Sequence, residues 1–505
     1  MTVALSWVPI VAPALVAVLY ALAGWRRATV WLGTGSALLM LLSGVLLAAR
    51  VLGSADRITL PGPAARLGTS SFLLVDPLSV FMLIVIGSVA VLTAVATPSY
   101  LAAEISAGRA SAQTAARHNM LVQTFLAAMA LAVLAADVGV LWVAVEATTI
   151  VTAFLVGQRR DRPAVEAAWK YVVICSAGIS LALLGIVLLN YASLRTGTGA
   201  GLSWVGLTAS AGHLDPGVTR IAVVLLVIGF GTKAGLAPLH AWLPDAHSQA
   251  PAPVSALMSG VLLAVAFYAI LRVKVIADLA LGPGFTQTLL LVVSLVSLTV
   301  AASLLLAQRD YKRMLAYSSI EHMSLLALGA AVGGGAASAA VLLHMLGHGL
   351  AKSVLFLGAG RVLQTTGTSR IDQVRGLAGS QPGLAGCLGL GVLALIGLPP
   401  FSIFASELGI ARAGLGSASP TVGWATALAL LLAVVIAAAL IGHTSAMLLG
   451  APASGPGAAV APVTLPRTTA VALGLGLTAA AALGVTAGPL TALLTAAAHT
   501  LTGAP

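Results

Sequence analysis

Charged side chains are scarce in this chain of 505 residues. Asp, Glu, Lys and Arg together make up 8% of it, whereas ordinary soluble domains carry roughly 25%. So few charges cannot cover a soluble fold of this size. Cysteine is also scarce: Cys175 and Cys387 stand singly in apolar runs, which excludes a disulfide scaffold and predicts two small core residues. Segments of about 10 residues with alternating polarity are missing too, which excludes an outer-membrane barrel.

The chain is rich in apolar runs, each long enough to cross a hydrocarbon core of about 30 Å. They predict an all-α polytopic membrane protein with about 14 transmembrane helices. Met1 to Tyr20 shows no basic region or cleavage site, so we expect no removable signal peptide. The predicted spans are residues 3–23, 28–52, 74–97, 119–136, 138–157, 168–191, 219–240, 252–274, 286–307, 315–333, 337–361, 383–411, 421–448 and 469–496.

The basic residues predict the orientation of these spans. Of 25 Lys and Arg, 15 lie in connections that follow odd-numbered spans and 8 in connections that follow even-numbered ones. Because basic loops stay in the cytoplasm, we expect a multi-pass protein of the cell (cytoplasmic) membrane with both termini outside. The net charge of +11 then reflects orientation, and the lipid bilayer rather than nucleic acid is the expected partner. Ala451 to Pro466, rich in Pro, Gly and Ala, is predicted to be a flexible linker.

Ionisable residues inside the predicted spans carry most of the functional information. A charged group in hydrocarbon costs several kcal/mol by insertion scales, so such a residue is a functional candidate by default. The candidates for a proton-transfer chain are Glu146, Lys233, His322, His344, His348, Lys352 and Glu407.

The eleventh span places His344, His348 and Lys352 at positions i, i+4 and i+8. At 3.6 residues per turn they form one titratable stripe, roughly 12 Å long. Such a stripe suits a proton relay, because histidine titrates near neutral pH. Structural hydrogen bonding is an alternative. Metal binding by the two histidines is a weaker one, because Lys352 would repel a cation and no nearby carboxylate is evident, so we predict no metal site and no cofactor.

Two spans contain prolines that predict broken helices. Lys233 stands five residues before Pro238 in the seventh span, and Pro399-Pro400 interrupts the twelfth before Glu407. Broken membrane helices expose backbone only where they line a cavity. Lys233 could therefore alternate between pairing with Glu146 and holding a proton; a fixed Glu–Lys pair is the structural alternative. Because five spans separate the two breaks, they suggest two repeats of opposite orientation.

Four other charged residues have simpler interpretations. Arg272 and Lys274 end a span and are expected to reach toward the lipid–water boundary. Lys312 is expected in an interfacial basic cluster. Asp76, before Pro77, is either a helix N-terminal residue or a carboxylate on an access path.

The segment from Gly231 to His247, followed by Ala250-Pro-Ala-Pro-Val-Ser-Ala256, resembles the signature of a family of antiporter-like proton-translocating membrane subunits. These occur in respiratory complex I, membrane-bound hydrogenases, formate hydrogenlyase and Mrp-type sodium/proton antiporters. Three further blocks resemble the family in the same order: 310–320, 344–353 and Gly397-Leu-Pro-Pro-Phe401. The segments 166–176 and 318–323 resemble hydrogenase-4 component F most closely.

This resemblance implies fourteen helices, two inverted five-helix repeats and broken helices 7 and 12. It divides the chain into residues 1–118 (helices 1–3), 119–274 (first repeat), 275–448 (second repeat) and 449–505 (linker and helix 14). It makes Glu146 the fifth-helix glutamate, Lys233 the broken-helix lysine and Glu407 the terminal acid of the twelfth helix.

Two positions depart from the family pattern: Ser259 and Ala264 stand where other members have a histidine or an eighth-helix lysine. Water, or His322 with Glu321, would have to bridge the two halves.

The resemblance implies a proton-translocating, non-redox subunit of a complex I-like or hydrogenase-4-like complex. Coupling would arrive as a change in the electrostatics of Glu146 and Lys233, passed toward Lys352 and Glu407, with redox chemistry in partner membrane subunits. Two alternatives stay open. One is a transporter module, such as an Mrp-like sodium/proton antiporter or an inorganic-carbon uptake subunit; the other is a scaffold that moves nothing.

Overall fold

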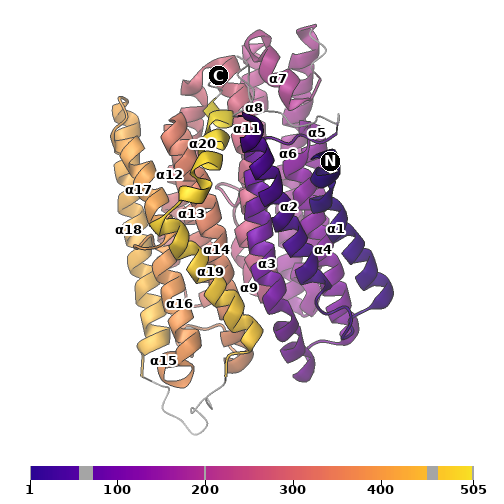
Figure 1. Ribbon diagram of the computed structural model, residues 1–505. Coiled ribbons are helices and arrows are strands. Elements are labelled where there is room, and N and C mark those ends of the chain that lie inside the picture. Colours follow the sequence, from indigo (N-terminus) through magenta and orange to yellow (C-terminus); the bar gives the residue numbers. More distant parts are fainter. Residues whose placement is uncertain (1, 56–71, 198–200, 452–463, 503–505) are drawn as a thin grey trace.

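The computed structural model describes residues 2–55, 72–197, 201–451 and 464–502. Within these ranges the regular elements are all helical, and the long helices form one bundle (Figure 1). Thirteen described helices are long and apolar enough to cross a membrane. The predicted all-α polytopic fold is thereby confirmed. Most of the predicted linker 451–466 lies outside the described residues.

The helices fall into three sequence groups. The N-terminal group comprises α1 (Thr2–Ala23), α2 (Leu32–Ala55), α3 (Pro77–Ser106), α4 (Ala112–Leu134), α5 (Val138–Val156), η1 (Gly157–Arg159), α6 (Arg162–Arg195), α7 (Trp204–Ser210) and η2 (Ala211–His213). The middle group comprises α8 (Pro216–Ala234), α9 (Trp242–Gln249), α10 (Ala252–Leu257), the π-helical turn η3 (Met258–Leu262), α11 (Leu263–Leu281), α12 (Pro283–Leu306), α13 (Tyr311–Val332) and α14 (Gly334–Thr366). The C-terminal group comprises α15 (Leu377–Ser380), α16 (Pro382–Leu395), α17 (Ser402–Leu415), α18 (Pro420–Leu449), α19 (Arg467–Val485) and α20 (Gly488–Thr502).

Many helices begin at a polar residue whose side chain caps the first turn. Each of these side chains accepts a hydrogen bond from the backbone N–H three residues further on, which satisfies a donor that the helix leaves free. The capping residues are Asp76, Ser111, Asp137, Asp161, Ser203, Asp215 and Asp310. Five of the acidic side chains at span ends therefore have a local structural role.

The seventh span is broken, as predicted. Helix α8 ends at Ala234, Gly235 adopts the left-handed conformation at φ 78°, and α9 begins at Trp242. Neighbouring side chains satisfy the freed backbone groups: Trp242 Nε1 donates to the Thr232 carbonyl at 2.9 Å, and Ser297 Oγ accepts from the Ala237 N–H at 2.8 Å. These two bonds satisfy backbone groups that the break would otherwise leave free inside a membrane.

The twelfth span is broken as well. It consists of α16 and α17, each of 14 residues. Gly397, at φ 67°, turns the chain, and an added Cβ there would collide with the Glu407 carboxylate. The turn therefore needs glycine, and it brings Glu407 back against the break. Because this span and the seventh are five spans apart, they cross the membrane in opposite directions.

The last predicted span, 469–496, is not one helix. It divides into α19 and α20, separated at Thr486 and Ala487, with Thr486 in an extended conformation. Pro489 explains the division, since a proline disfavours helical geometry in the residue before it and lacks an N–H to continue the ladder. The start of α1 and the end of α20 lie toward the same end of the bundle (Figure 1).

Helices α11, α13 and α14 form the buried centre. Almost every residue along them is inaccessible, in contrast to α6 and α18, which expose many large apolar side chains. Helices α6 and α8 approach closely at two glycines: a Cβ on Gly178 would collide with Thr232, and one on Gly229 with the backbone of Ala182. This close contact fixes the position of the last turn of α8, which carries Lys233.

Candidate functional site

The seven predicted residues fall into two clusters. The lysine cluster consists of Glu146 on α5, Lys233 on α8 and Tyr171 on α6. The histidine cluster consists of Glu321 and His322 on α13, His344, His348 and Lys352 on α14, and Glu407 on α17. Both lysines and the three histidines have no exposed surface, whereas Glu146 and Glu407 are partly exposed.

In the lysine cluster, Lys233 bonds to a residue that was not among the predicted ones. Its Nζ donates to the Tyr171 hydroxyl at 2.6 Å and lies 4.8 Å from the centre of that ring. No ion pair joins Lys233 to Glu146 in the described part of the chain. Glu146 instead accepts a hydrogen bond from the Thr149 hydroxyl at 2.9 Å. A fixed Glu–Lys pair is therefore wrong for this conformation, and Lys233 can exchange its partner without breaking an ion pair.

The histidine cluster joins two helices rather than following one. The stripe His344, His348 and Lys352 lies buried on α14 as predicted, but His322 from α13 stands between the two histidines. Its Nδ1 lies 3.0 Å from His344 Nε2, and its ring centre lies 5.0 Å from that of His348. The three imidazoles therefore form a group across two helices, with His322 next to both His344 and His348.

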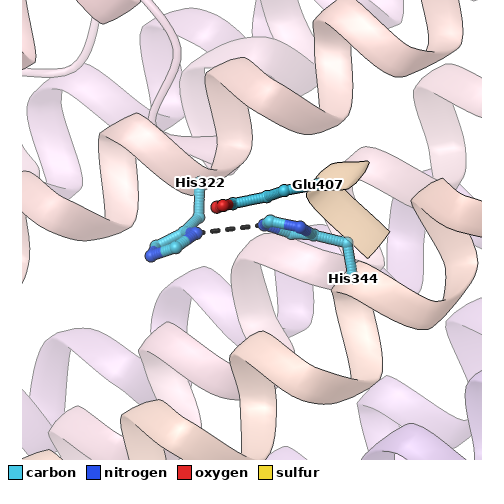
Figure 2. A group of neighbouring side chains, drawn as sticks. All are labelled: His322, His344 and Glu407. Carbon is cyan, nitrogen blue, oxygen red and sulfur yellow. Dashed lines mark hydrogen bonds between the residues drawn. The ribbon is translucent and has the colours of Figure 1, made fainter. Parts of the chain in front are cut away.

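The far end of the histidine cluster is formed by α17. Ser406 Oγ lies 2.9 Å from His344 Nδ1. Glu407, the next residue, extends its carboxylate beside the hydrogen bond that joins the two imidazoles (Figure 2). The expectation that no carboxylate lies near these histidines is thus wrong, because the broken span folds one onto them.

Lys352 ends the stripe on the opposite side. Its Nζ donates to the Leu315 carbonyl at 2.7 Å and to Ser318 Oγ at 2.5 Å, both on α13. Four polar atoms in this region have no hydrogen-bond partner among the described residues: Oε2 of Glu321, Nε2 of His322 and both ring nitrogens of His348. Buried polar atoms are rarely left unpaired without a reason, and exchangeable protons or water are the reason that fits these residue types.

A further buried histidine lies beside Lys352, and the sequence analysis did not single it out. His247, on α9, is fully buried, stacks on Phe356 with ring centres 5.0 Å apart, and has no partner for either ring nitrogen among the described residues. It is an electrostatic neighbour of both Lys352 and Lys312. Its position after Pro244-Asp-Ala in the quoted segment was the available signal. Ser259, where a base was expected, pairs its hydroxyl with that of Ser319 at 2.8 Å.

Lys312 is not part of an interfacial cluster. Its side chain is buried, and Nζ donates to the carbonyls of Ser248 and Ala250, each at 2.8 Å. A cation at these carbonyls is favoured because the last carbonyls of a helix, here α9, carry partial negative charge. Its place beside Arg309 and Arg313 in the sequence concealed this role.

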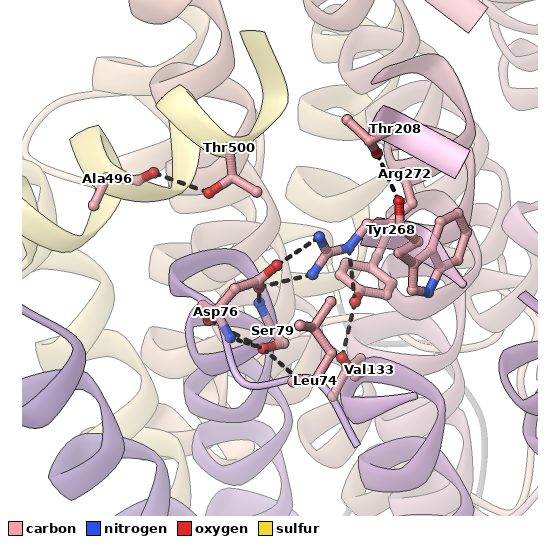
Figure 3. A network of polar contacts seen from close by, with 10 residues as sticks. Leu74, Asp76, Ser79, Val133, Thr208, Tyr268, Arg272, Ala496 and Thr500 are labelled. Carbon is pink, nitrogen blue, oxygen red and sulfur yellow. Dashed lines mark hydrogen bonds and ion pairs between the residues drawn. The ribbon is translucent and has the colours of Figure 1, made fainter. Parts of the chain in front are cut away.

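A third buried group is the arginine network, formed by Asp76, Arg272 and Tyr268 (Figure 3). Arg272 Nη1 and Nη2 contact the two carboxylate oxygens of Asp76 at 2.6 and 2.7 Å, and Nε donates to the Tyr268 hydroxyl at 3.0 Å. Tyr268 in turn donates to the Val133 carbonyl at 2.8 Å. Arg272 therefore does not reach for the lipid boundary as expected.

Asp76 has two structural roles in this network. It caps α3 in a reciprocal hydrogen-bond pair with Ser79, and it neutralises Arg272. Burial raises the pKa of Asp76, but the Arg272 guanidinium and the Ser79 hydrogen bonds more than offset this, so the pKa lies below its ordinary value. Of the two predicted interpretations of Asp76, the helix N-terminal one is observed.

Comparison with known proteins identifies the family. The transmembrane family described as NADH:quinone oxidoreductase/Mrp antiporter matches residues 135–447. The chain belongs to this family. The match runs from just before α5 almost to the end of α18, and it includes all seven predicted site residues. This antiporter-like subunit is therefore a polytopic protein of the cell membrane, in a family whose members work beside other membrane subunits.

Particular relatives agree with this assignment. The hydrogenase-4 component F homolog of Methylacidiphilum infernorum (isolate V4) is 40% identical over 372 residues, which cover 72% of this chain and 78% of the relative. A chain of the membrane-bound sulfane sulfur reductase, an archaeal respiratory membrane complex, shares the fold at a TM-score of 0.83, with 24% identity over 99% of this chain and 97% of its own. A chain of the Mrp complex from Dietzia sp. DQ12-45-1b does so at 0.80, with 22% identity over 99% and 98%.

Proposed function

We propose that this antiporter-like subunit moves protons across the membrane within a hydrogenase-like or complex I-like assembly whose redox chemistry lies in partner subunits. The observation that carries the proposal is the number of buried ionisable groups inside the spans: Lys233 in one cluster, and His247, Lys352 and the three histidines in and beside the other. Groups of this kind are costly inside a membrane. Their concentration inside the spans is best explained by protons that move between them.

The geometry of the histidine cluster supports a transfer step. A neutral imidazole donates through one ring nitrogen and accepts through the other, so it can take a proton on one side and release it on the other. The 3.0 Å contact between His322 and His344 is already a hydrogen bond. The unpartnered nitrogens of His348 and His322 provide the next step through a ring rotation or one water molecule.

The lysine cluster supports a control step. Lys233 is bonded to a neutral phenol and not to a carboxylate, so a charge change at Glu146 alters the field at Lys233 without first breaking an ion pair. The carbonyls at the end of α8 already favour a cation at this position. A change in the charge of Glu146, imposed by a neighbouring subunit, would thus favour the binding or the release of a proton at Lys233. His247 would receive the released proton.

The test uses inverted membrane vesicles from the native host, in which the chromosomal gene is replaced by each variant. We expect Lys233→Ala and Glu146→Gln to abolish proton uptake, measured with a pH-sensitive dye during substrate oxidation, while the subunit still co-purifies with its partners. Wild-type uptake in both variants would refute the proposed roles. Mass spectrometry of the co-purified subunits names the complex.

Cation/proton antiport is the second candidate, because the matching family description includes Mrp antiporters. A sodium gradient applied to the same vesicles distinguishes the two. Antiport predicts proton movement driven by sodium without substrate oxidation, whereas a redox-coupled pump predicts none.

The membrane orientation is also part of this proposal. The excess of Lys and Arg in the odd connections supports a cytoplasmic location for them and an outside location for both termini. Reporter fusions after Ala107 and after Gly282 test it, and we expect the first to report the cytoplasm and the second the outside.

A further inference from the structure

We infer that His322, His344 and Glu407 form a binding site for a divalent transition metal of the zinc class, and that metal binding closes the histidine cluster to protons. One ligand atom from each of the three side chains lies within 4.8 Å of the other two. The three come from three helices, α13, α14 and α17, so the site exists only because the broken twelfth span folds back onto the stripe (Figure 2).

The ligand types and spacings suit Zn²⁺. Imidazole nitrogen and carboxylate oxygen bind it at about 2.0–2.2 Å, so tetrahedral ligands stand roughly 3.3 Å apart. His322 Nδ1 and His344 Nε2 are 3.0 Å apart and face each other. An ion between them therefore requires the two rings to separate only slightly and the carboxylate to close in.

The ring protons also fit metal binding. When Nδ1 of His322 and Nε2 of His344 coordinate a metal, the proton of each ring must sit on its other nitrogen. Nδ1 of His344 lies 2.9 Å from Ser406 Oγ, which can accept that hydrogen bond and hold the ring in place. Such a hydrogen bond to the second nitrogen orients metal-binding histidines in general. His348 offers a further ligand, because both of its ring nitrogens are unpartnered among the described residues. Its ring centre lies 5.0 Å from that of His322.

The local charges favour a cation. Glu407 is a ligand, and the buried Glu321 is its electrostatic neighbour. Lys352, which would repel a metal, is eight residues beyond His344, roughly 12 Å along the helix, but it is an electrostatic neighbour of His322 and Glu321. Its Nζ is held by α13. Two carboxylates, Glu407 and Glu321, therefore stand against one lysine near the site.

A cavity supplies a route from the surface. A cavity of about 480 Å³ opens between α11, α12, the α13–α14 turn and α20, and it is lined by Lys274, Asp278, Gln287, Ser338 and Val341 among others. Val341 precedes His344 by three residues on α14, so one lining residue is about one helical turn from a proposed ligand.

The consequence for transfer follows from the proposed function. A metal that occupies the facing nitrogens of His322 and His344 replaces the hydrogen bond through which a proton would pass. Bound Zn²⁺ would therefore block the pathway at its most constricted contact. The binding itself does not depend on proton pumping, so the two claims are tested separately.

The binding test uses the purified full chain in detergent, with Co²⁺ as the spectroscopic probe and Zn²⁺ as its competitor. We expect one Co²⁺ per chain, with the visible absorption of a nitrogen- and oxygen-ligated site, displaced by Zn²⁺. His344→Gln, His322→Gln and Glu407→Gln should each weaken binding by at least about tenfold, and Ser406→Ala, which removes only the orienting hydroxyl, by about tenfold with unchanged stoichiometry.

The matched control is His118→Gln. His118 is also buried, on α4, where its Nδ1 lies 2.8 Å from Gln158 Oε1, and its loss should leave Co²⁺ binding unchanged. Size-exclusion elution and thermal unfolding check that each variant is folded. Because the four variants lie on three different helices, loss of Co²⁺ binding in all of them while they stay folded indicates loss of ligands and not misfolding. The inference fails if the wild type binds no Co²⁺ at one per chain. It also fails if folded ligand variants bind like the wild type, or if binding is lost only on replacing the exposed histidines His213 and His499.

Inhibition is then measured in the vesicles. Zn²⁺ should stop proton uptake in the wild type and in His118→Gln at the concentration that displaces Co²⁺. If Zn²⁺ displaces Co²⁺ but proton uptake continues, the site exists and the blocking role is wrong.

Discussion

The arginine network and the histidine cluster are both buried polar groups in one membrane bundle, but their bonding differs. In the network, both carboxylate oxygens of Asp76, the Arg272 guanidinium and the Tyr268 hydroxyl all have partners. In the histidine cluster, four buried polar atoms have none among the described residues. Groups whose hydrogen bonds are all formed hold the helices together and have no free position for a proton. Groups with unpaired nitrogen or oxygen atoms can accept and pass on protons. The following predictions test this distinction.

The largest effect is expected at His322. Replacing it with Ala removes the group that stands between His344 and His348, and proton transfer should fall by about 10²–10⁴-fold, the usual contribution of a positioned acid–base group. Dye-monitored proton uptake in inverted vesicles measures this. Tyr268→Phe, in the arginine network, is the control and should transfer protons normally. An equal loss in both variants would remove the distinction between the two regions.

The second effect concerns stability. Arg272→Met leaves Asp76 as a buried carboxylate without its cation, which should lower the free energy of unfolding by about 3–5 kcal/mol. Denaturant unfolding of the purified chain in detergent measures it. The double variant Asp76→Leu with Arg272→Met should recover most of the loss, because no uncompensated charge stays buried. His322→Asn should change stability far less; a comparable loss there would argue that the histidines are structural.

The third effect is a pH dependence of stability. Because the folded pKa of Asp76 lies below its ordinary value, its contribution is fully present above the unfolded pKa and is lost as the pH falls through the folded pKa. The difference in unfolding free energy between the wild type and Asp76→Asn should therefore shrink on acidification. A difference that stays constant down to the acid limit would show that the ionised carboxylate is not what stabilises the network.

The smallest effect is expected at Tyr171. Tyr171→Phe removes the hydrogen bond to Lys233 but keeps the ring beneath the ammonium group. Loss of a hydrogen bond to a charged group costs about 1.5 kcal/mol or more, so the free energy of unfolding should fall by about that amount and proton uptake by roughly tenfold. Tyr191→Phe, which changes an exposed tyrosine on the same helix, serves as the control. Unchanged uptake in Tyr171→Phe would mean that Lys233 is positioned by its helix alone.

The sequence analysis predicted the features that depend on apolar periodicity and on the positions of proline. The spans, the two breaks and the shared face of His344, His348 and Lys352 follow from patterns within single segments. The place of His322 could not be predicted, because α13 is buried on all sides and no apolar face reveals its rotation against α14. Arg272 was misread for a related reason: its partner Asp76 is 196 residues away, beyond any local pattern.

The same limit applies to Glu407 and Lys312. The Glu407 carboxylate reaches the histidines only because the chain turns at Gly397. The Lys312 ammonium group bonds to carbonyls at the end of α9, a short helix that the sequence analysis did not predict as a separate element. Contacts between helices depend on how the helices rotate and pack against one another. The residue pattern within one segment does not reveal that rotation.

One close approach links the outside of the bundle to its interior. A Cβ on Gly484, near the end of α19, would collide with the backbone of Pro400 and Phe401, so two main chains touch there with no side chain between them. Helix α17, which carries Ser406 and Glu407, starts at this contact. If the proposed function holds, a neighbouring subunit that moved α19 would therefore also displace the start of α17 and, with it, the carboxylate of Glu407.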